Sequence, residues 1–217
     1  MNAKCLQTGD ECLKALFARY PEVKSCEAAV HSAYEMLRDA FSGGNKIMVC
    51  GNGGSAADAE HVVGELMKSF RFKRPVNESF IAAYRETNRQ EVPAWLEGAL
   101  PAISLVSQTA LSTAFCNDES AIGLFAQQVY GYGRTGDVLL AISTSGNSSN
   151  VVEAAKVSRA LEIGVIALTG SSESELSRIA DICIRVPRRE VFEVQELHLP
   201  IYHALCAAIE ADFFGGV

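Results

Sequence analysis

The segment CGNGGSAADAEHVVGE, which runs from Cys50 to Glu65, decides how the rest of the chain is arranged. It follows a short apolar run, and its glycines let the backbone turn sharply from a strand into a helix that begins near Ser55. Free amide groups at the start of such a helix attract an anion. We therefore expect an anion-binding turn here, called the first loop (residues 51–55). A tight turn whose glycines serve only steric needs is the alternative.

Two titratable side chains follow on the same predicted helix. His61 and Glu65 are four residues apart, so they share one helical face, about one turn below the expected anion site. A phosphate anchor and a basic side-chain pair would then lie together.

Five short apolar or β-branched runs are spaced like the strands of a parallel sheet, and helical patterns lie between most of them. The runs are 46–51, 102–106, 138–144, 164–170 and 182–187, and the helical patterns are 55–70, 119–131, 149–161, 174–179 and 194–213. Two further helices, at 13–20 and 28–41, precede the sheet. This alternation predicts an α/β fold with three layers, a doubly wound, flavodoxin-like sheet of five parallel strands, and ligands at the carboxyl ends of the strands.

A second polar turn, Ser143 to Asn150, joins the third run to the next helix and is called the second loop. Its hydroxyl groups and its glycine offer side-chain and backbone donors to three phosphate oxygens. A cluster of N-capping residues is the alternative. The chain contains no GxxxxGK[ST], and its one GxGxxG match, Gly131 to Gly136, precedes an apolar run and does not join a strand to a following helix, so nucleoside triphosphates and dinucleotides are poorly supported.

The last predicted helix carries further polar groups, Gln195, Glu196, His198 and His203. Glu196 and His203 project to nearly the same side, whereas His198 points elsewhere. Either histidine could instead be a partly buried residue bonded to a neighbour. Pro200 has no amide donor, and we expect it to interrupt or kink this helix.

Length and composition limit the class of protein. The 217 residues, 48% of them hydrophobic, are suited to one domain, residues 1–217, with N-terminal helices in 1–44 and an inserted segment at 68–101. A net charge of −7 makes nucleic acid an unlikely partner, and we interpret the basic residues Arg71, Lys73 and Arg74 as a solvated turn. No membrane span or secretory signal is recognisable, which predicts a cytoplasmic protein.

Two further expectations concern the inserted segment and the cysteines. A helix from Asn77 to Arg89 in the inserted segment could belong to a lid or an interface element. The seven cysteines include no CxxC pair, and Cys50, Cys183 and Cys206 are expected to be buried thiols. Cys116 is the one expected to be exposed.

In combination, these motifs resemble the sugar isomerase (SIS) domain family and, within it, the sedoheptulose 7-phosphate isomerases, also called phosphoheptose isomerases. The resemblance covers most of residues 30–213. Its positions are Gly51–Ser55, Ala59–His61 with Glu65, Pro101–Leu105, Asn117–Asp118, Gly136–Asp137, Ser143–Ser148, and Gln195–Glu196 with His203.

The resemblance implies a role for each matching residue. Substrate and phosphate contacts would come from Asn52, Gly53, Gly54, Ser55, Asn117, Asp118, Ser143, Thr144, Ser145, Ser148 and Gln195. Glu65 and His203 would be the catalytic acid/base pair. Zinc would be bound by His61, Glu65, Gln195 and His203. The family also implies a homotetramer with sites at subunit contacts.

The implied activity is aldose–ketose isomerisation of a phosphosugar, with sedoheptulose 7-phosphate converted to D-glycero-D-manno-heptose 7-phosphate through an enediol. Three departures from the family pattern leave the substrate open: the long segment 68–101, Val191–Glu193 in place of a common Thr and Arg, and Pro200. The alternatives are another C7 or C8 ketose phosphate, an SIS-type lyase or aminosugar isomerase, and a non-catalytic phosphosugar-binding module, including one that associates with a replication initiator.

Overall fold

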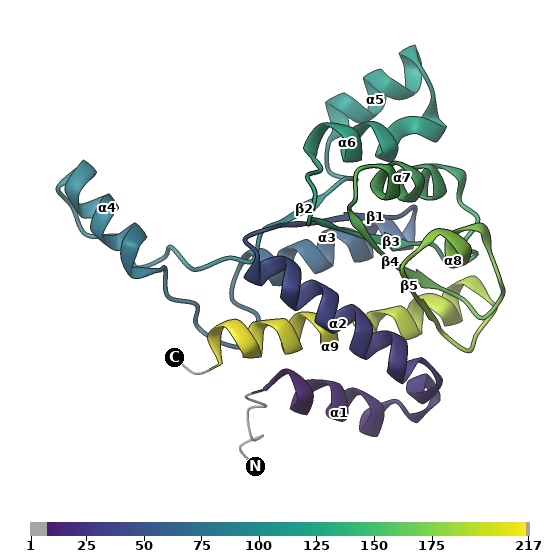
Figure 1. The fold of residues 1–217 in the computed structure, drawn as a ribbon, viewed down its shortest axis with the longest axis horizontal. Coiled ribbons are helices and arrows are strands. Elements are labelled where there is room, and N and C mark those ends of the chain that lie inside the picture. Colours follow the sequence, from purple (N-terminus) through teal and green to yellow (C-terminus); the bar gives the residue numbers. More distant parts are fainter. Residues whose placement is uncertain (1–7, 216–217) are drawn as a thin grey trace.

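A computed structural model describes residues 8–215 and contains a sheet of five parallel strands (Figure 1). The strands are β1 (Ile47–Cys50), β2 (Ala102–Ser104), β3 (Val138–Ile142), β4 (Gly164–Thr169) and β5 (Ile182–Arg185). Their order across the sheet is β2-β1-β3-β4-β5. The predicted doubly wound, flavodoxin-like sheet is therefore confirmed.

The strands are buried on both faces, which explains why they appear in the sequence as continuous apolar runs. Along β3, Val138, Leu140 and Ile142 belong to one hydrophobic core, and Leu139 and Ala141 belong to the other. This alternation follows from the two-residue period of a strand.

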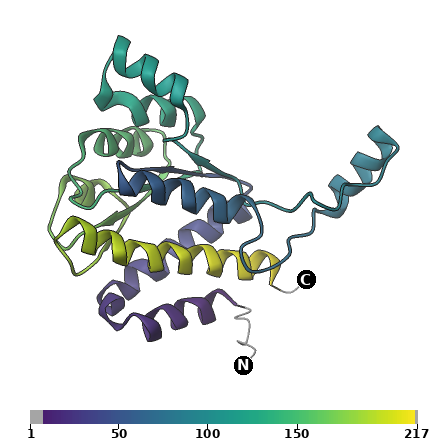
Figure 2. The same ribbon diagram turned by 180° about the vertical axis from the view of Figure 1, so that it is seen from behind.

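Helices cover each face of the sheet. One face packs against α2 (Glu27–Ser42), α3 (Gly54–Met67) and α9 (Val191–Phe214), and α1 (Gly9–Arg19) packs on the outside of α9. Figure 2 shows α3 and α9 side by side across this face. The other face packs against α6 (Leu124–Tyr132), α7 (Ser149–Ala160) and α8 (Glu175–Ile179). Short 3-10 helices, η1 (Pro21–Cys26) and η2 (Ala121–Gly123), complete the chain between these elements.

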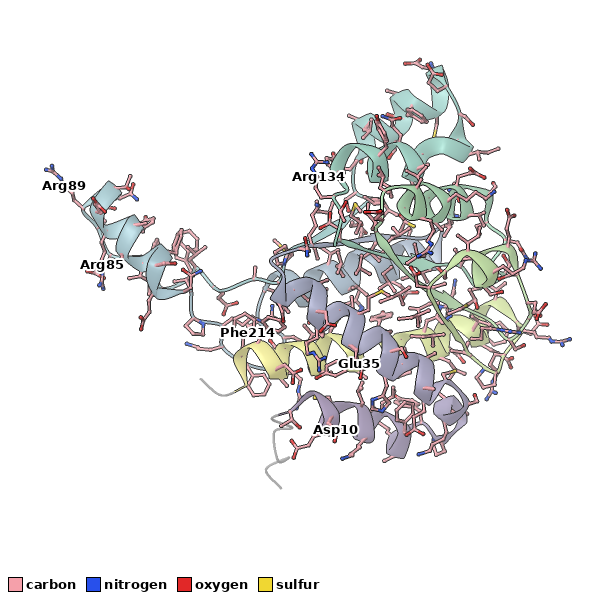
Figure 3. The ribbon with its side chains drawn as sticks, in the orientation of Figure 1. Asp10, Glu35, Arg85, Arg89, Arg134 and Phe214 are labelled. Atoms are coloured by element: carbon pink, nitrogen blue, oxygen red, sulfur yellow. The ribbon has the colours of Figure 1, made fainter. Side chains whose placement is uncertain are left out.

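The inserted segment forms an arm that extends from the body of the protein (Figure 1). Its helix, α4 (Glu78–Asn88), matches the helix expected from the sequence, and none of its residues is buried within the described part of the chain. Arg85 and Arg89 point outward from it (Figure 3). Trp95, which follows α4, is 78% exposed. Whether the arm acts as a lid or an interface stays a prediction.

The helix α5 (Thr109–Asp118) was not expected from the sequence. None of its residues is buried, and it packs against η2 and α6. Its apolar residues therefore lack the one-sided pattern of a helix that rests on the sheet, and that pattern was the signal on which the other helices were recognised.

The prediction that Pro200 interrupts the last helix is wrong. The helix α9 runs continuously from Val191 to Phe214, and Pro200 is buried within it. Thirteen residues of α9 are buried, so packing against its neighbours outweighs the hydrogen bond that proline cannot donate.

The prediction that Arg71, Lys73 and Arg74 form a solvated turn is also wrong in part. Arg74 is 2% exposed, and its Nε donates to Glu210 Oε1 at 2.8 Å. Its two terminal nitrogens donate to the backbone carbonyls of Leu66 and Glu65. This guanidinium therefore ties the end of α3 to α9.

The cysteines largely follow expectation. Cys50 and Cys206 are buried free thiols, and Cys116 is exposed. Cys183 is only partly buried. Cys5 lies outside the described residues. Over residues 8–215, no helix has the length and apolarity needed to cross a membrane.

Acid pH should destabilise the protein through His198. Burial lowers the pKa of this imidazole from 6.5 to about 4, and Nε2 lies 3.3 Å from the backbone oxygen of Thr169. Because the unfolded chain binds the proton between these two pH values and the folded chain does not, stability falls as the pH drops from 6.5 towards 4. The loss should be about 3 kcal/mol.

Urea unfolding at several pH values measures this effect. In His198→Gln the free energy of unfolding should change less over the same pH range than in the wild type, whereas His31→Gln, on the half-buried face of α2, should keep the wild-type slope. Equal slopes in the wild type and in His198→Gln would contradict the assignment.

Candidate active site

The first loop follows β1, and the second loop follows β3. These two strands are neighbours in the sheet, and the chain leaves them in opposite directions across it, to β2 and to β4. This is the topological switch point, where parallel α/β sheets bind their ligands.

The first loop needs glycine for steric reasons. Gly53 has φ of +56°, in the region that favours glycine, and a Cβ on Gly51 would lie 2.5 Å from the backbone oxygen of Ser55. The helix α3 begins at Gly54, next to the predicted Ser55. Asn52, Gly53 and Gly54 are exposed and Ser55 is buried, so the loop presents its backbone and Asn52 to solvent.

The second loop is a compact turn at the start of α7. Ser143 Oγ and Ser148 Oγ lie 3.0 Å apart, and Gly146 has φ of +66°. Ser145 is exposed, and Thr144 is partly buried. Ser148 is the N-cap residue of α7, but its hydroxyl makes no capping hydrogen bond within the described structure. Its hydroxyl is therefore not committed to the capping role that was the alternative for this turn.

A pair of amides joins the two loops. Asn52 Nδ2 donates to Asn150 Oδ1 at 2.8 Å, and Asn150 Nδ2 donates to Asn52 Oδ1 at 2.9 Å. The reciprocal pair places both loops at one rim of the sheet. Asn150 was not among the predicted site residues, because nothing in the sequence indicates which amide would face Asn52 across 98 residues.

Gln195 lies beside the first loop. A Cβ on Gly54 would be 2.6 Å from Gln195 Nε2, so the glycine leaves room for this amide. On α9, Gln195 precedes His203 by eight residues, which corresponds to about 12 Å along the axis. Within one chain, Gln195 therefore belongs with the loops and not with His203.

A cluster of His61, Glu65 and His203 forms where α3 crosses α9. His61 Nε2 is 3.2 Å from Glu65 Oε1 and 3.3 Å from His203 Nε2. The three ligand atoms all lie within 4.8 Å of one another. Glu65 and His203, the expected acid/base pair, therefore lie close together within one chain.

The distance from the first loop is larger than expected. His61 follows Gly54 by seven residues, or about 10 Å along α3, which is two turns instead of one. The cluster and the first loop occupy different stretches of the same helix. A ligand that reaches both must be extended.

The cluster has the donor set and the spacing of a zinc site. Two imidazole nitrogens and one carboxylate oxygen are common zinc ligands, and with bonds of about 2.0–2.1 Å two tetrahedral ligands lie about 3.3 Å apart. The distances from His61 Nε2 to its two neighbours agree with that value. Three protein ligands leave a fourth position open, as in catalytic zinc sites.

The surroundings of the cluster influence how its side chains hold protons. Burial, and then the neighbouring His61, lower the pKa of His203, so its imidazole is neutral near pH 7. Glu65 Oε2 is buried and accepts no hydrogen bond from the described residues, and Lys68 Nζ lies 3.8 Å from it. The cluster therefore contains a neutral imidazole and a carboxylate oxygen without a hydrogen-bond donor, which are two groups that accept protons.

Asn117 and Asp118 lie elsewhere. They end α5, both are exposed, and Asn117 Nδ2 donates to Asp118 Oδ1 at 2.8 Å. Since α5 packs on η2 and α6, it makes no extensive contact with α3 or α9. Their expected contact with substrate stays a prediction.

Adding one methyl group to the second loop should disrupt it. In Gly146→Ala the new Cβ would approach Ser174 Oγ to 2.1 Å, at a backbone φ that alanine rarely adopts. We expect the apparent affinity for sugar phosphate to fall at least tenfold, and isothermal titration with inorganic phosphate and substrate measures it. Gly131→Ala, at a position with nothing within 4 Å of the added Cβ, is the matched control. Unchanged affinity in Gly146→Ala would count against a phosphate-binding second loop.

Comparison with known proteins agrees with this geometry. A model of the SIS domain matches residues 14–99 and 82–170. The phosphoheptose isomerase of Akkermansia muciniphila is 33% identical over 197 residues, which cover 91% of this chain and 92% of the relative. That of Shewanella baltica is 34% identical over 208 residues, 94% of each chain.

Solved structures give the same result. The phosphoheptose isomerase from Neisseria gonorrhoeae has a TM-score of 0.70 and 32% identity, over 94% of this chain and 99% of that one. The enzyme from Francisella tularensis has a TM-score of 0.73 and 31% identity, over 90% and 92%. The chain therefore belongs to the SIS domain family, and the relatives that it resembles over almost its whole length are phosphoheptose isomerases.

Proposed function

We propose that this protein is a phosphoheptose isomerase, which converts sedoheptulose 7-phosphate to D-glycero-D-manno-heptose 7-phosphate through an enediol. One observation carries the proposal: a carboxylate and a neutral imidazole meet at the crossing of α3 and α9, on the helix whose N-terminus forms the first loop. Relatives of the same length and fold bear that name.

The two loops would hold the phosphate group. Backbone amides of the first loop and hydroxyls of Ser143, Ser145 and Ser148 are the donors that an anion requires. Gln195 and Asn52 stand at the same rim and would bind sugar hydroxyls. An open-chain sugar of seven carbons is long enough to extend from such an anchor towards the cluster, which lies about two turns further along α3.

The chemistry requires two proton transfers. The Glu65 carboxylate would remove the proton from the carbon beside the carbonyl, and His203 would move protons between the two oxygens of the enediol. Each positioned acid or base contributes about 10²- to 10⁴-fold. His61, Glu65 and His203 would hold Zn²⁺, which when bound supplies Lewis acid stabilisation of negative charge on the sugar oxygens.

A binding module without catalysis has less support. A sensor needs the phosphate loops but no proton-transfer pair, and both Glu65 and His203 are retained in contact with His61.

A second candidate, isomerisation of another C7 or C8 ketose phosphate, is favoured by Val191 and Phe192. These side chains are 58% and 61% exposed, one helical turn before Gln195, so the rim of the site carries apolar groups where the family commonly has polar ones.

Two properties of the enzyme form part of the proposal. By family resemblance the protein is a homotetramer, and the exposed apolar residues of the arm and of α5 and α6 provide surface for subunit contacts. It is also proposed to act in the cytoplasm. Light scattering of the purified chain measures the first property, and a monomeric mass at assay concentration would contradict it.

Incubation with sedoheptulose 7-phosphate tests the function. The product should appear in ¹H and ³¹P NMR spectra, with solvent deuterium incorporated at the carbon that exchanges its proton. A panel of C6 to C8 ketose phosphates and aminosugar phosphates, with and without added Zn²⁺, separates the candidates. Absence of turnover for the heptose with turnover of another member would replace the substrate, and absence of turnover for all would support a binding module.

A further inference from the structure

Behind the cluster lies a hydrogen-bonded chain of three side chains, Asp58, Tyr202 and His61. Tyr202 Oη lies 3.1 Å from Asp58 Oδ1 and 3.1 Å from His61 Nδ1. Tyr202 is 1% exposed, and its ring meets the His61 ring edge-on at 5.6 Å. Asp58 and His61 come from α3, and Tyr202 comes from α9 directly before His203. None of these contacts is used by the phosphate loops.

The number of available protons determines which atom donates in each of these two hydrogen bonds. Tyr202 has one hydroxyl proton, and an ionised carboxylate can only accept. When the hydroxyl donates to Asp58 Oδ1, its oxygen can only accept from His61, so Nδ1 must carry the proton of that imidazole. The other nitrogen, Nε2, then carries no proton and faces Glu65 Oε1 at 3.2 Å and His203 Nε2 at 3.3 Å, so acceptor atoms converge where a cation would be bound.

We propose that Asp58 and Tyr202 are positioning residues that hold His61 as the Nδ1–H tautomer, with Nε2 available as a ligand. The proposal rests on the proposed function only for the role of His61 as a ligand. A hydrogen bond from the second ring nitrogen of a metal-binding histidine fixes both its tautomer and its orientation. Here the fixing group is a tyrosine hydroxyl oriented by a carboxylate.

The same two helices would therefore supply both the ligands and their support. Tyr202 and His203 are consecutive on α9, and Asp58 lies one turn before His61 on α3. A shift of α9 relative to α3 would move His203 and the support of His61 together. The buried Tyr202 ring thus couples the crossing of the helices to the orientation of His61.

The tautomer of His61 can be measured directly in metal-free protein without substrate. Long-range ¹H–¹⁵N correlation spectra distinguish Nδ1–H from Nε2–H imidazoles, and single His→Gln variants assign the four histidines. In the wild type, His61 should be the Nδ1–H form. In Asp58→Ala the hydroxyl of Tyr202 is free to donate to Nδ1, so His61 should change to the Nε2–H form. In Tyr202→Phe the preference for Nδ1–H should be lost.

Zinc affinity gives a second measurement. Competition with a chromophoric chelator should show Zn²⁺ binding about 10- to 100-fold weaker in Tyr202→Phe, the usual effect of removing such a hydrogen bond. The matched control is Tyr34→Phe, which removes another tyrosine–carboxylate hydrogen bond, to Asp212 of α9, away from the cluster. The control should keep the wild-type affinity and tautomer.

Each result decides the proposal. An Nε2–H form of His61 in the wild type would overturn it even if the variants fail to fold. An Nδ1–H form that persists in Asp58→Ala, or equal losses of zinc affinity in Tyr202→Phe and Tyr34→Phe, would also overturn it. Because the tautomer is read without substrate or metal, a protein that does not turn over the heptose can still satisfy the proposal, and the two failures remain distinguishable.

Discussion

Glu65→Gln should lower turnover of sedoheptulose 7-phosphate by about 10²- to 10⁴-fold, the contribution of one positioned base. The amide keeps the size of the side chain and can still lie beside His61, but it cannot take a proton from carbon. Since Glu65 is only partly buried and its Oε2 accepts no hydrogen bond from the described residues, the free energy of unfolding should change little. NMR assays under saturating substrate, with unfolding in urea, measure both quantities.

Two further variants distinguish chemistry from folding. His203→Ala should cause a loss of turnover of similar size, whereas Glu60→Gln should keep most of the activity. Glu60 is an exposed glutamate on the same helix, and its Oε1 accepts from Ser107 Oγ. Bound zinc is quantified in each variant, because Glu65 also belongs to the proposed ligand set. If Glu65→Gln loses turnover only in proportion to lost zinc, Glu65 is a ligand and not the base.

Glu210→Ala should lower the free energy of unfolding by about 3–5 kcal/mol, because it leaves the charge of Arg74 buried without its partner. Both side chains of this pair are fully buried. Glu210 also accepts from the backbone amides of Phe70 and Arg71, at 2.8 and 2.7 Å. Such a loss is a large part of the about 5–15 kcal/mol that stabilises a typical domain, and urea or thermal unfolding measures it.

The consequences extend to the site. Arg74 donates to the carbonyls of Glu65 and Leu66, so loss of Glu210 should also loosen the end of α3 and lower turnover in the fraction that stays folded. Glu91→Ala breaks the ion pair with Arg85 on the exposed arm and serves as the control. Solvent screens such pairs, so this change should leave stability nearly unaltered. Equal effects of the two substitutions would contradict the role of the buried pair.

Much of the fold could be predicted because its signals are local. Every strand lies within its predicted run, and the helices on the sheet match their predicted positions to within a few residues. The two loops were recognisable because glycines and hydroxyls directly follow apolar strands. The helix α5 was missed because it lacks such a local signal. It packs away from the sheet and has no buried residue to mark one face.

Errors arose where distant segments meet. Arg74 looked like part of a solvated basic turn until α9 brought Glu210 to it from 136 residues away. Pro200 looked like a break in a helix that extensive burial keeps continuous. In both cases the local pattern was outweighed by packing that the sequence does not display.

The sequence by itself determined the class of fold, the carboxyl ends of the strands as the place for ligands, and the residue types able to bind phosphate and move protons. Only the tertiary structure decided which of them meet. It brings His203 to His61 across 142 residues, places Gln195 at the first loop instead of the cluster, and adds Asp58 and Tyr202 behind His61. The physical reason is that strand and helix periods encode which face of an element is buried, whereas the crossing of α3 and α9 depends on how whole faces pack together.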